Sequence, residues 1–142
     1  MSVEKIYPRS PLEMMAGWVH LPRLIDKIRL HLAGKLAADY QPNYLEKGFD
    51  AKWFEAAEVE KTKFVEIVKN SVTDGQVCDW VLAHVKASDR TKEKFKEYVM
   101  DYGREGEELR AKLQQRKEES GIADRDDIQC FVDYIDADEK RI

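Results

Sequence analysis

One amphipathic segment, from Leu21 to Gly34, constrains the fold more than any other part of the chain. Its first turn contains Pro22, which suits that position because the N–H groups of a first helical turn have no intrahelical partner. Gly34 stands where a left-handed residue commonly ends a helix. We therefore expect a helix between Pro22 and Gly34. Its apolar face recurs with the period of an α-helix, at Leu21, Leu24, Ile25, Ile28 and Leu32.

The residues on either side of this segment predict a second helix and a loop. Ser10 can accept a backbone N–H, Pro11 suits a first helical position, and Glu13 stands where a capping-box partner belongs. These residues predict a short helix that ends near Gly17. Residues 35–50 show no clear period, so we expect a long ordered loop there.

Beyond the loop, the helical period returns and continues to the C-terminus. Asp50 is expected to cap a helix that carries Trp53 and Phe54. A densely charged helix is expected over 104–119, ending at Gly121. Other helices are expected to carry Phe64 and Val68, and to begin near Thr73 or Asp74, Ser88 or Asp89, and Asp124 or Asp126. The chain is therefore expected to be all-α: one compact domain over 1–142, a helical bundle of five to seven helices.

Composition supports this class. The chain has 142 residues, 43% of them hydrophobic and 37% charged, with few Gly and Pro, as in a soluble helical domain. It has no apolar run near the roughly 20 residues that a membrane span needs, so no membrane association is expected. The N-terminal residues lack the apolar stretch of a signal peptide. Cys78 and Cys130 belong to no CxxC pair and are expected to be reduced, which predicts a cytoplasmic protein.

Charge is distributed unevenly along the chain. The net charge of −4 argues against nucleic-acid binding. Residues 1–35 nevertheless hold six Lys and Arg against three Asp and Glu, whereas the remainder holds 18 against 25. A small anionic ligand is therefore expected to bind the N-terminal third, if one binds at all.

The N-terminal third also supplies the candidate ligand-binding residues. A helix that begins beside several basic side chains can bind a phosphate or carboxylate. In this interpretation the Arg and Lys residues hold the anion, Asp26 orients a guanidinium and Trp18 forms a wall. The alternative is a solvated helix face on which Asp26 pairs with Arg23 or Arg29. The candidate set is Arg9, Trp18, His20, Arg23, Asp26, Lys27 and Tyr40.

Other chemical motifs are missing from the sequence. The three histidines, His20, His31 and His84, have neither the mutual spacing nor the cysteine neighbours of a zinc site, so no metal is predicted. The sequence has no G-x-S-x-G, no P-loop and no G-x-G-x-x-G, and no cofactor is predicted.

Several segments are similar to a known family. They are Arg9-Ser10-Pro11, the run GWVHLPRLIDK from Gly17, LAGK from Leu32 and FVDYIDADEKR from Phe131. In these segments the chain resembles a bacterial family catalogued as domain of unknown function 5069. It departs from the expected Gly-Gly pair at Ala16-Gly17. The resemblance implies a single bacterial cytosolic domain and brings no agreed activity or catalytic residues.

Three functions remain open at this stage. The first is a non-catalytic cytosolic binding or interaction module, with the anion site described above and with a homodimer as a candidate assembly. The second is a small enzyme for a carboxylated or phosphorylated metabolite, in which His20 is the acid–base group and Asp26 its orienter or a second carboxylate. The third is a structural subunit with exposed apolar patches on the last two helices. A deep cavity would favour the enzyme, and a flat surface at Trp18–Lys27 the module.

Overall fold

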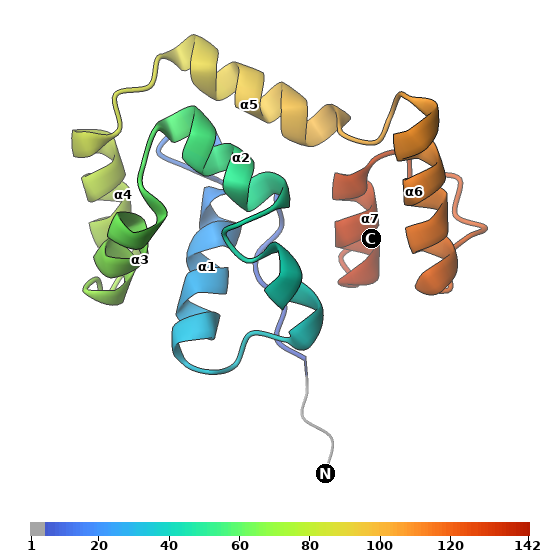
Figure 1. The fold of residues 1–142 in the computed structure, drawn as a ribbon, viewed down its shortest axis with the longest axis horizontal. Helices are drawn as coiled ribbons and strands as arrows, with labels where there is room; N and C mark the ends of the chain where they lie inside the picture. The colour runs from blue at the N-terminus through green and yellow to red at the C-terminus, as the bar shows by residue number, and fades with distance from the viewer. Residues whose placement is uncertain (1–4) are drawn as a thin grey trace. The chain divides into compact units, whose positions relative to one another are not determined.

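The computed structural model describes residues 5–142. Residues 1–4, part of the stretch expected to lack a signal peptide, lie outside the described residues. The described chain is mostly helical, as expected (Figure 1). None of its helices is both long and apolar enough to cross a membrane. The elements are β1 (Met14–Met15), β2 (Trp18–Val19), α1 (Leu21–Leu32), the 3-10 helix η1 (Ala38–Asn43), α2 (Gly48–Ala57), α3 (Lys61–Lys69), α4 (Asp74–His84), α5 (Asp89–Asp101), α6 (Glu107–Glu119) and α7 (Phe131–Asp138).

Contacts group these elements into two compact units. The first ends at Phe95, and the second comprises Lys96–Ile142, so α5 contributes residues to both. The candidate site residues all belong to the first unit.

The short helix expected before Gly17 is wrong, because these residues form a β-hairpin. β1 and β2 pair antiparallel. The turn between them has φ 53° at Ala16 and φ 84° at Gly17. Positive φ at both central residues is typical of the tightest hairpin turns and is incompatible with a right-handed helix. Ser10 does accept a backbone N–H, from Leu12 at 3.1 Å, but the bond closes a turn.

The helix predicted between Pro22 and Gly34 is confirmed as α1. Leu21, Leu24, Ile25 and Ile28 are fully buried, whereas Leu32 at the end of the stripe is 47% exposed. Gly34 has φ 70°, and its N–H donates to His31 O at 3.0 Å. The next N–H, of Lys35, reaches back to Leu30 O at 2.8 Å. This pair of bonds is the Schellman motif that a left-handed glycine permits.

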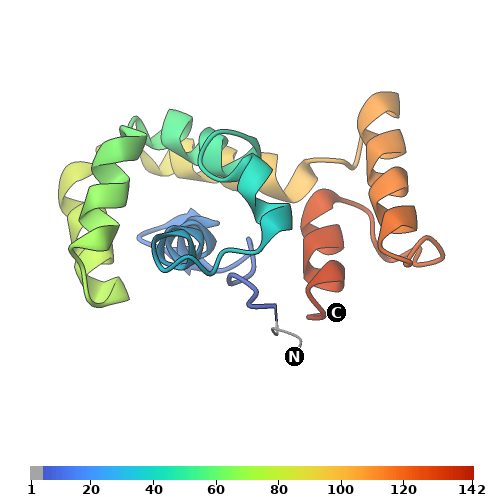
Figure 2. The same cartoon turned by 60° about the horizontal axis from the view of Figure 1, so that its bottom comes forward.

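Aromatic rings form the core around α1. Figure 2 views α1 almost along its axis, with α2 over one side and α3 beside another. Trp18 meets Trp53 edge-on at a centroid distance of 5.8 Å and Phe95 at 5.7 Å. Trp53 in turn packs on Phe64 at 5.0 Å. Such edge contacts add to the free energy gained by burying large rings.

Two of the predicted helix starts are found, and the predicted cap at Asp50 is not. Thr73 caps α4, through a capping box with Gln76. Ser88 precedes α5 and accepts the N–H of Thr91 at 3.1 Å. Asp50 does not cap α2: the helix begins at Gly48, and Asp50 lies inside its first turn, only 1% exposed. The expected loop over 35–50 contains a 3-10 helix, η1.

The second unit has its own small core. Leu113 of the charged helix α6 packs with Ile128 and Ala137. At Gly103, φ is 98°, and a Cβ would lie 2.6 Å from the ring of Phe131, so glycine is required there. The final helix begins at Phe131 rather than after either predicted aspartate, and Ile128 precedes it.

Candidate functional site

The carboxylate of Asp50 is the centre of a buried charged cluster, the Asp50 cluster, made of Asp50, His20 and Lys27. His20 Nε2 lies 2.7 Å from Asp50 Oδ1, and Lys27 Nζ donates to Asp50 Oδ2 at 2.7 Å. The backbone N–H of Leu45 donates to the same Oδ2 at 3.1 Å. The three side chains are only 2%, 7% and 1% exposed for His20, Lys27 and Asp50. The cluster therefore joins the start of α1, the middle of α1, the segment between η1 and α2, and α2 itself inside the core.

Local sequence explains how each side chain reaches this position. The buried residues of α2 are Asp50, Trp53, Phe54 and Ala57, which follow the helical spacing of one apolar stripe. Asp50 thus stands on the face that the helix buries. His20 precedes α1 with a left-handed φ of 70°, which ends β2 and turns the chain into the helix.

Burial and charge act in opposite directions on Asp50. Burial favours its neutral form, but the hydrogen bond with His20 and the charge of Lys27 outweigh burial and lower the pKa of Asp50 to about 2. Burial also lowers the pKa of His20 below its usual 6.5, and the neighbouring carboxylate does not reverse that shift. At neutral pH the cluster therefore holds an ionised Asp50 and a neutral His20, whose Nε2–H donates to the carboxylate.

The second ring nitrogen of His20, Nδ1, does not contact Asp50. Nδ1 is buried, and it has no hydrogen-bond partner among the described residues. The ring meets Phe49 edge-on at a centroid distance of 5.7 Å. A carboxylate that orients an imidazole is the arrangement used by general bases. Here the imidazole is enclosed.

A second set of charges lies closer to solvent, and we call it the surface network: Arg9, Asp26, Arg29 and Asp74. Arg9 donates to Asp26 through Nε at 2.9 Å and Nη2 at 3.0 Å, and through its backbone N–H at 2.8 Å. Asp74 accepts from Arg9 at 2.9 Å and from Arg29 at 2.6 Å. The side chains are 23% to 37% exposed. The network connects the N-terminal segment to α1 and to the first turn of α4.

The remaining candidates pack elsewhere in the first unit. Arg23 is 4% exposed; it donates to Arg9 O at 3.1 Å, and its guanidinium lies 5.6 Å from the ring centroid of Tyr40. That distance is within cation–π range. Trp18, expected to form a wall of the anion site, is fully buried and packs on Trp53 and Phe95 in the aromatic core.

The predicted residue set is thus divided among three places rather than gathered in one pocket. Arg9 and Asp26 pair with each other, Arg23 meets Tyr40, and His20 and Lys27 share Asp50. The solvated-face alternative is wrong for Arg23 and Lys27, which are buried.

Asp26 also has a different partner from those predicted. It binds Arg9, not Arg23 or Arg29, and it does not orient His20. Asp50 does that instead.

Two functional-looking residues, Asp50 and Asp74, were missing from the predicted set. Asp50 was interpreted as a helix cap, although its spacing to Trp53, Phe54 and Ala57 places it on the buried stripe. An aspartate on an apolar stripe indicates a buried charge that needs cationic partners. Asp74 carries no comparable sequence signal, because its partners come from residues 45 and 65 positions away.

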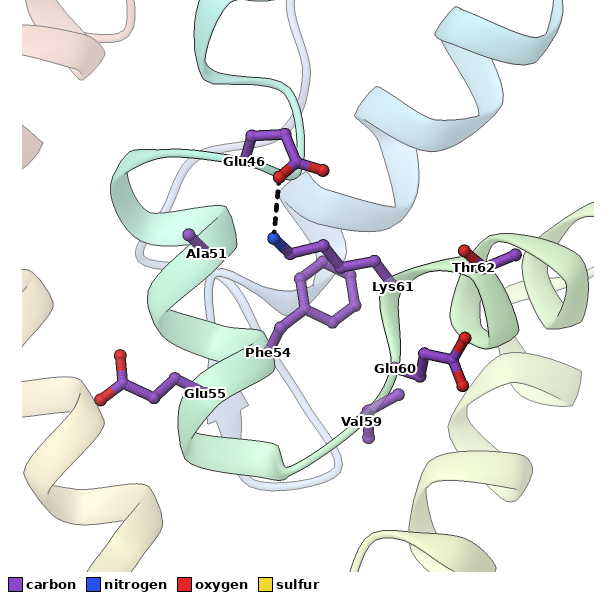
Figure 3. A pocket seen from close by; sticks show the side chains of 8 residues that line it. All are labelled: Glu46, Ala51, Phe54, Glu55, Val59, Glu60, Lys61 and Thr62. Carbon is purple, nitrogen blue, oxygen red and sulfur yellow. Dashed lines mark hydrogen bonds and ion pairs between the residues drawn. The ribbon is translucent and has the colours of Figure 1, made fainter.

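A hollow in the first unit is lined by none of the three side chains of the Asp50 cluster. It has a volume of about 530 Å³ and is open to solvent (Figure 3). We call it the α2–α3 hollow. Its lining residues are Glu46, Ala51, Phe54, Glu55, Val59, Glu60, Lys61 and Thr62. Another hollow, of about 260 Å³, belongs to the second unit and is lined by Asp101, Tyr102, Gly103, Arg104, Glu105 and Leu109. Neither contains a residue of the predicted set.

Residues 5–141 match the model described as Domain of unknown function (DUF5069). The chain belongs to this family. The match includes both compact units and confirms the resemblance drawn from the N-terminal and C-terminal segments. A search of curated proteins returned no match.

Proposed function

We propose that this DUF5069 chain is a non-catalytic cytoplasmic binding module that acts by recognising another polypeptide. The observation that carries the proposal is the burial of the titratable side chains in the N-terminal third. His20, Lys27 and Asp50 face one another inside the core and form hydrogen bonds mainly with one another rather than with solvent. The free thiols of Cys78 and Cys130 favour a reducing compartment.

The proposal does not include an external anion among the candidate residues. The anion that His20 and Lys27 contact is the chain's own Asp50 carboxylate, at 2.7 Å from each. An incoming phosphate or carboxylate would have to displace the buried Asp50 carboxylate from both His20 and Lys27. That displacement is costly, because two anions would then compete for the same hydrogen-bond donors.

A module of this kind is expected to be part of a larger complex in its own cell. The chain has a mass of 16.6 kDa. Light scattering after size exclusion of tagged protein from its native cells should give a mass well above that value, whereas the recombinant chain alone should give the monomer or dimer. A native mass equal to the recombinant one would contradict the module.

One observation favours the enzyme as a second candidate: the buried His20–Asp50 pair with an unpartnered Nδ1. Untargeted mass spectrometry of a metabolite extract incubated with the protein separates the two functions. The module predicts no metabolite consumed. A metabolite that wild type consumes and a folded His20→Asn variant spares would establish the enzyme instead.

The structural-subunit alternative lacks its expected feature. The large apolar residues that are exposed in the described chain include none from α6 or α7. We therefore do not extend the proposal to that class.

A further inference from the structure

The segment between α1 and α2 lies against the Asp50 cluster without joining the core. We call residues 37–47 the strap; they include η1 and connect the two helices (Figure 1). No residue of the strap is buried. A segment that buries so little surface opens locally at a lower free-energy cost than the helices beside it. The strap is therefore a candidate for opening while the first unit stays folded.

A backbone hydrogen bond joins the strap to the cluster. The N–H of Leu45 donates to Asp50 Oδ2 at 3.1 Å, and Lys27 Nζ donates to the same oxygen at 2.7 Å. Because both donors meet one oxygen atom, the backbone of Leu45 lies beside the Lys27 ammonium. Burial and the nearby charge of Asp50 raise the pKa of Tyr44 to about 12, so the preceding residue is also close to this carboxylate. The strap thus covers Lys27 on the side of Oδ2.

Rings at the surface hold the strap on α1. Tyr44 stacks on His31 at a centroid distance of 4.2 Å, with the ring planes inclined by 25°. Tyr40 receives the guanidinium of Arg23 on its ring at 5.6 Å. Both tyrosines are only partly buried, so water can reach these contacts. Leu45 has a left-handed φ of 61°, a conformation that costs free energy in a residue with a side chain. This strain favours opening.

The Asp50 cluster does not need the strap to stay assembled. His20 and Lys27 belong to the start and the middle of α1, and Asp50 belongs to α2, so all three lie outside residues 37–47. Opening would break the bond from Leu45 and leave the two 2.7 Å contacts of the carboxylate in place. The open state would therefore keep the buried charges paired while it admits water to them.

We propose that the strap opens as a unit while α1 and α2 stay folded, and that this opening exposes the Lys27 amine and the Asp50 carboxylate to solvent. The closed strap shields both groups from reagents and partners, and the open strap makes them accessible. The inference goes beyond the proposed function and does not rest on it, because a strap of this kind can serve an interaction module or an enzyme.

The test uses the full chain and two measurements. Hydrogen exchange should show that the strap amides exchange at least about tenfold faster than the central amides of α1 and α2. Acylation by the N-hydroxysuccinimide ester of acetic acid, read by mass spectrometry, should modify Lys27 more slowly than the exposed Lys63. The Lys27 rate should stay constant at urea concentrations below the unfolding transition, because local opening exposes little new surface.

The variant Tyr44→Ala should accelerate acylation of Lys27 about two- to tenfold, because it removes the stack on His31. His31→Ala removes the same stack from the α1 side and should have a similar effect. The matched control is His84→Ala, which removes the stack between His84 and Trp80, at 4.9 Å, outside the strap. It should keep the wild-type rate at Lys27.

Three outcomes would overturn the strap. The first is exchange of the strap amides at the rate of α1 and α2. The second is acylation of Lys27 as fast as that of Lys63, which would mean that nothing shields it. The third is a faster Lys27 reaction in Tyr44→Ala that is fully accounted for by a lower global stability in urea denaturation, or that His84→Ala reproduces.

Discussion

The Asp50 cluster and the surface network are built from similar residues in opposite surroundings. Each joins α1 or the residue before it to a later helix through one aspartate that contacts two basic side chains. Asp50 is 1% exposed, whereas Asp74 is 37% exposed. Water can replace a lost partner at Asp74 but has little access to Asp50. The contribution of an ion pair to stability therefore depends on how deeply its charges are buried, not on the presence of the pair alone.

The largest effect is expected from breaking the buried cluster at its centre. Asp50→Asn keeps the shape of the side chain but leaves Lys27 buried without an anion, and it weakens the contact with His20. We expect a loss of about 3–5 kcal/mol in the free energy of unfolding. Urea denaturation measures it. Asp26→Asn is the control from the surface network, and an equal loss in that variant would contradict the comparison.

A smaller loss of stability is expected when Lys27, the cation left without its anion, is replaced together with Asp50. In the double variant Asp50→Asn/Lys27→Met, the buried charge is gone and the methionine fills a similar volume. The double variant should be more stable than the sum of the two single losses predicts, by at least about 1 kcal/mol. Strict additivity in urea denaturation would show that Lys27 and Asp50 contribute independently, despite the 2.7 Å between them.

Acid should weaken the buried cluster in two windows. The pKa of His20 is below 6.5 in the folded chain, so the unfolded chain takes up that proton first as the pH falls. The contribution of neutral His20 to the free energy of unfolding is therefore fully present above about pH 6.5 and decreases as the pH falls below that value. The Asp50 contribution declines later, as the pH falls from 3.8 towards the folded pKa of about 2.

The His20 window is checked by measuring unfolding free energy at about pH 7.5 and about pH 5. The stability difference between wild type and His20→Gln should narrow towards the lower pH, because the variant has no imidazole to protonate. A constant difference would mean that His20 does not contribute to acid sensitivity.

The smallest effect is expected in the surface network. Asp74→Asn removes the charge that joins Arg9 to Arg29, but all three side chains reach solvent. We expect the free energy of unfolding to fall by less than about 1 kcal/mol, and this loss should become smaller as salt is added. Thermal unfolding at low and high ionic strength tests this. A loss as large as that of Asp50→Asn would mean that the network is as important to folding as the core.

Local signals predicted much of the helical framework. The stripe of α1, its glycine end at Gly34 and the helix start at Thr73 depend on neighbouring residues, so they could be predicted correctly from sequence spacing. The hairpin at Ala16–Gly17 was missed because Ser10 and Pro11 suit a turn as well as a helix. Pairing between β1 and β2 decided between them, and pairing is a contact rather than a propensity.

The candidate site was predicted less well for the same reason. The clustering of charge in the N-terminal third indicates His20 and Lys27 as candidates for binding an anion, and in the structure both contact the chain's own Asp50 carboxylate. The sequence could not show that this carboxylate is Asp50, 30 and 23 positions away from them. Nor could it show that Arg23 is enclosed, since burial depends on what other segments cover it.

Local spacing and residue identity are enough to specify the helical class, the family and the position of α1. Which charges are buried and which meet water depends instead on contacts between distant segments. Packing brought Asp50 between His20 and Lys27 and left Glu55 and Glu60 at the rim of an open hollow. The free energy that a charged group contributes depends on the dielectric around it, and the segments that pack over it, often distant in the sequence, set that dielectric.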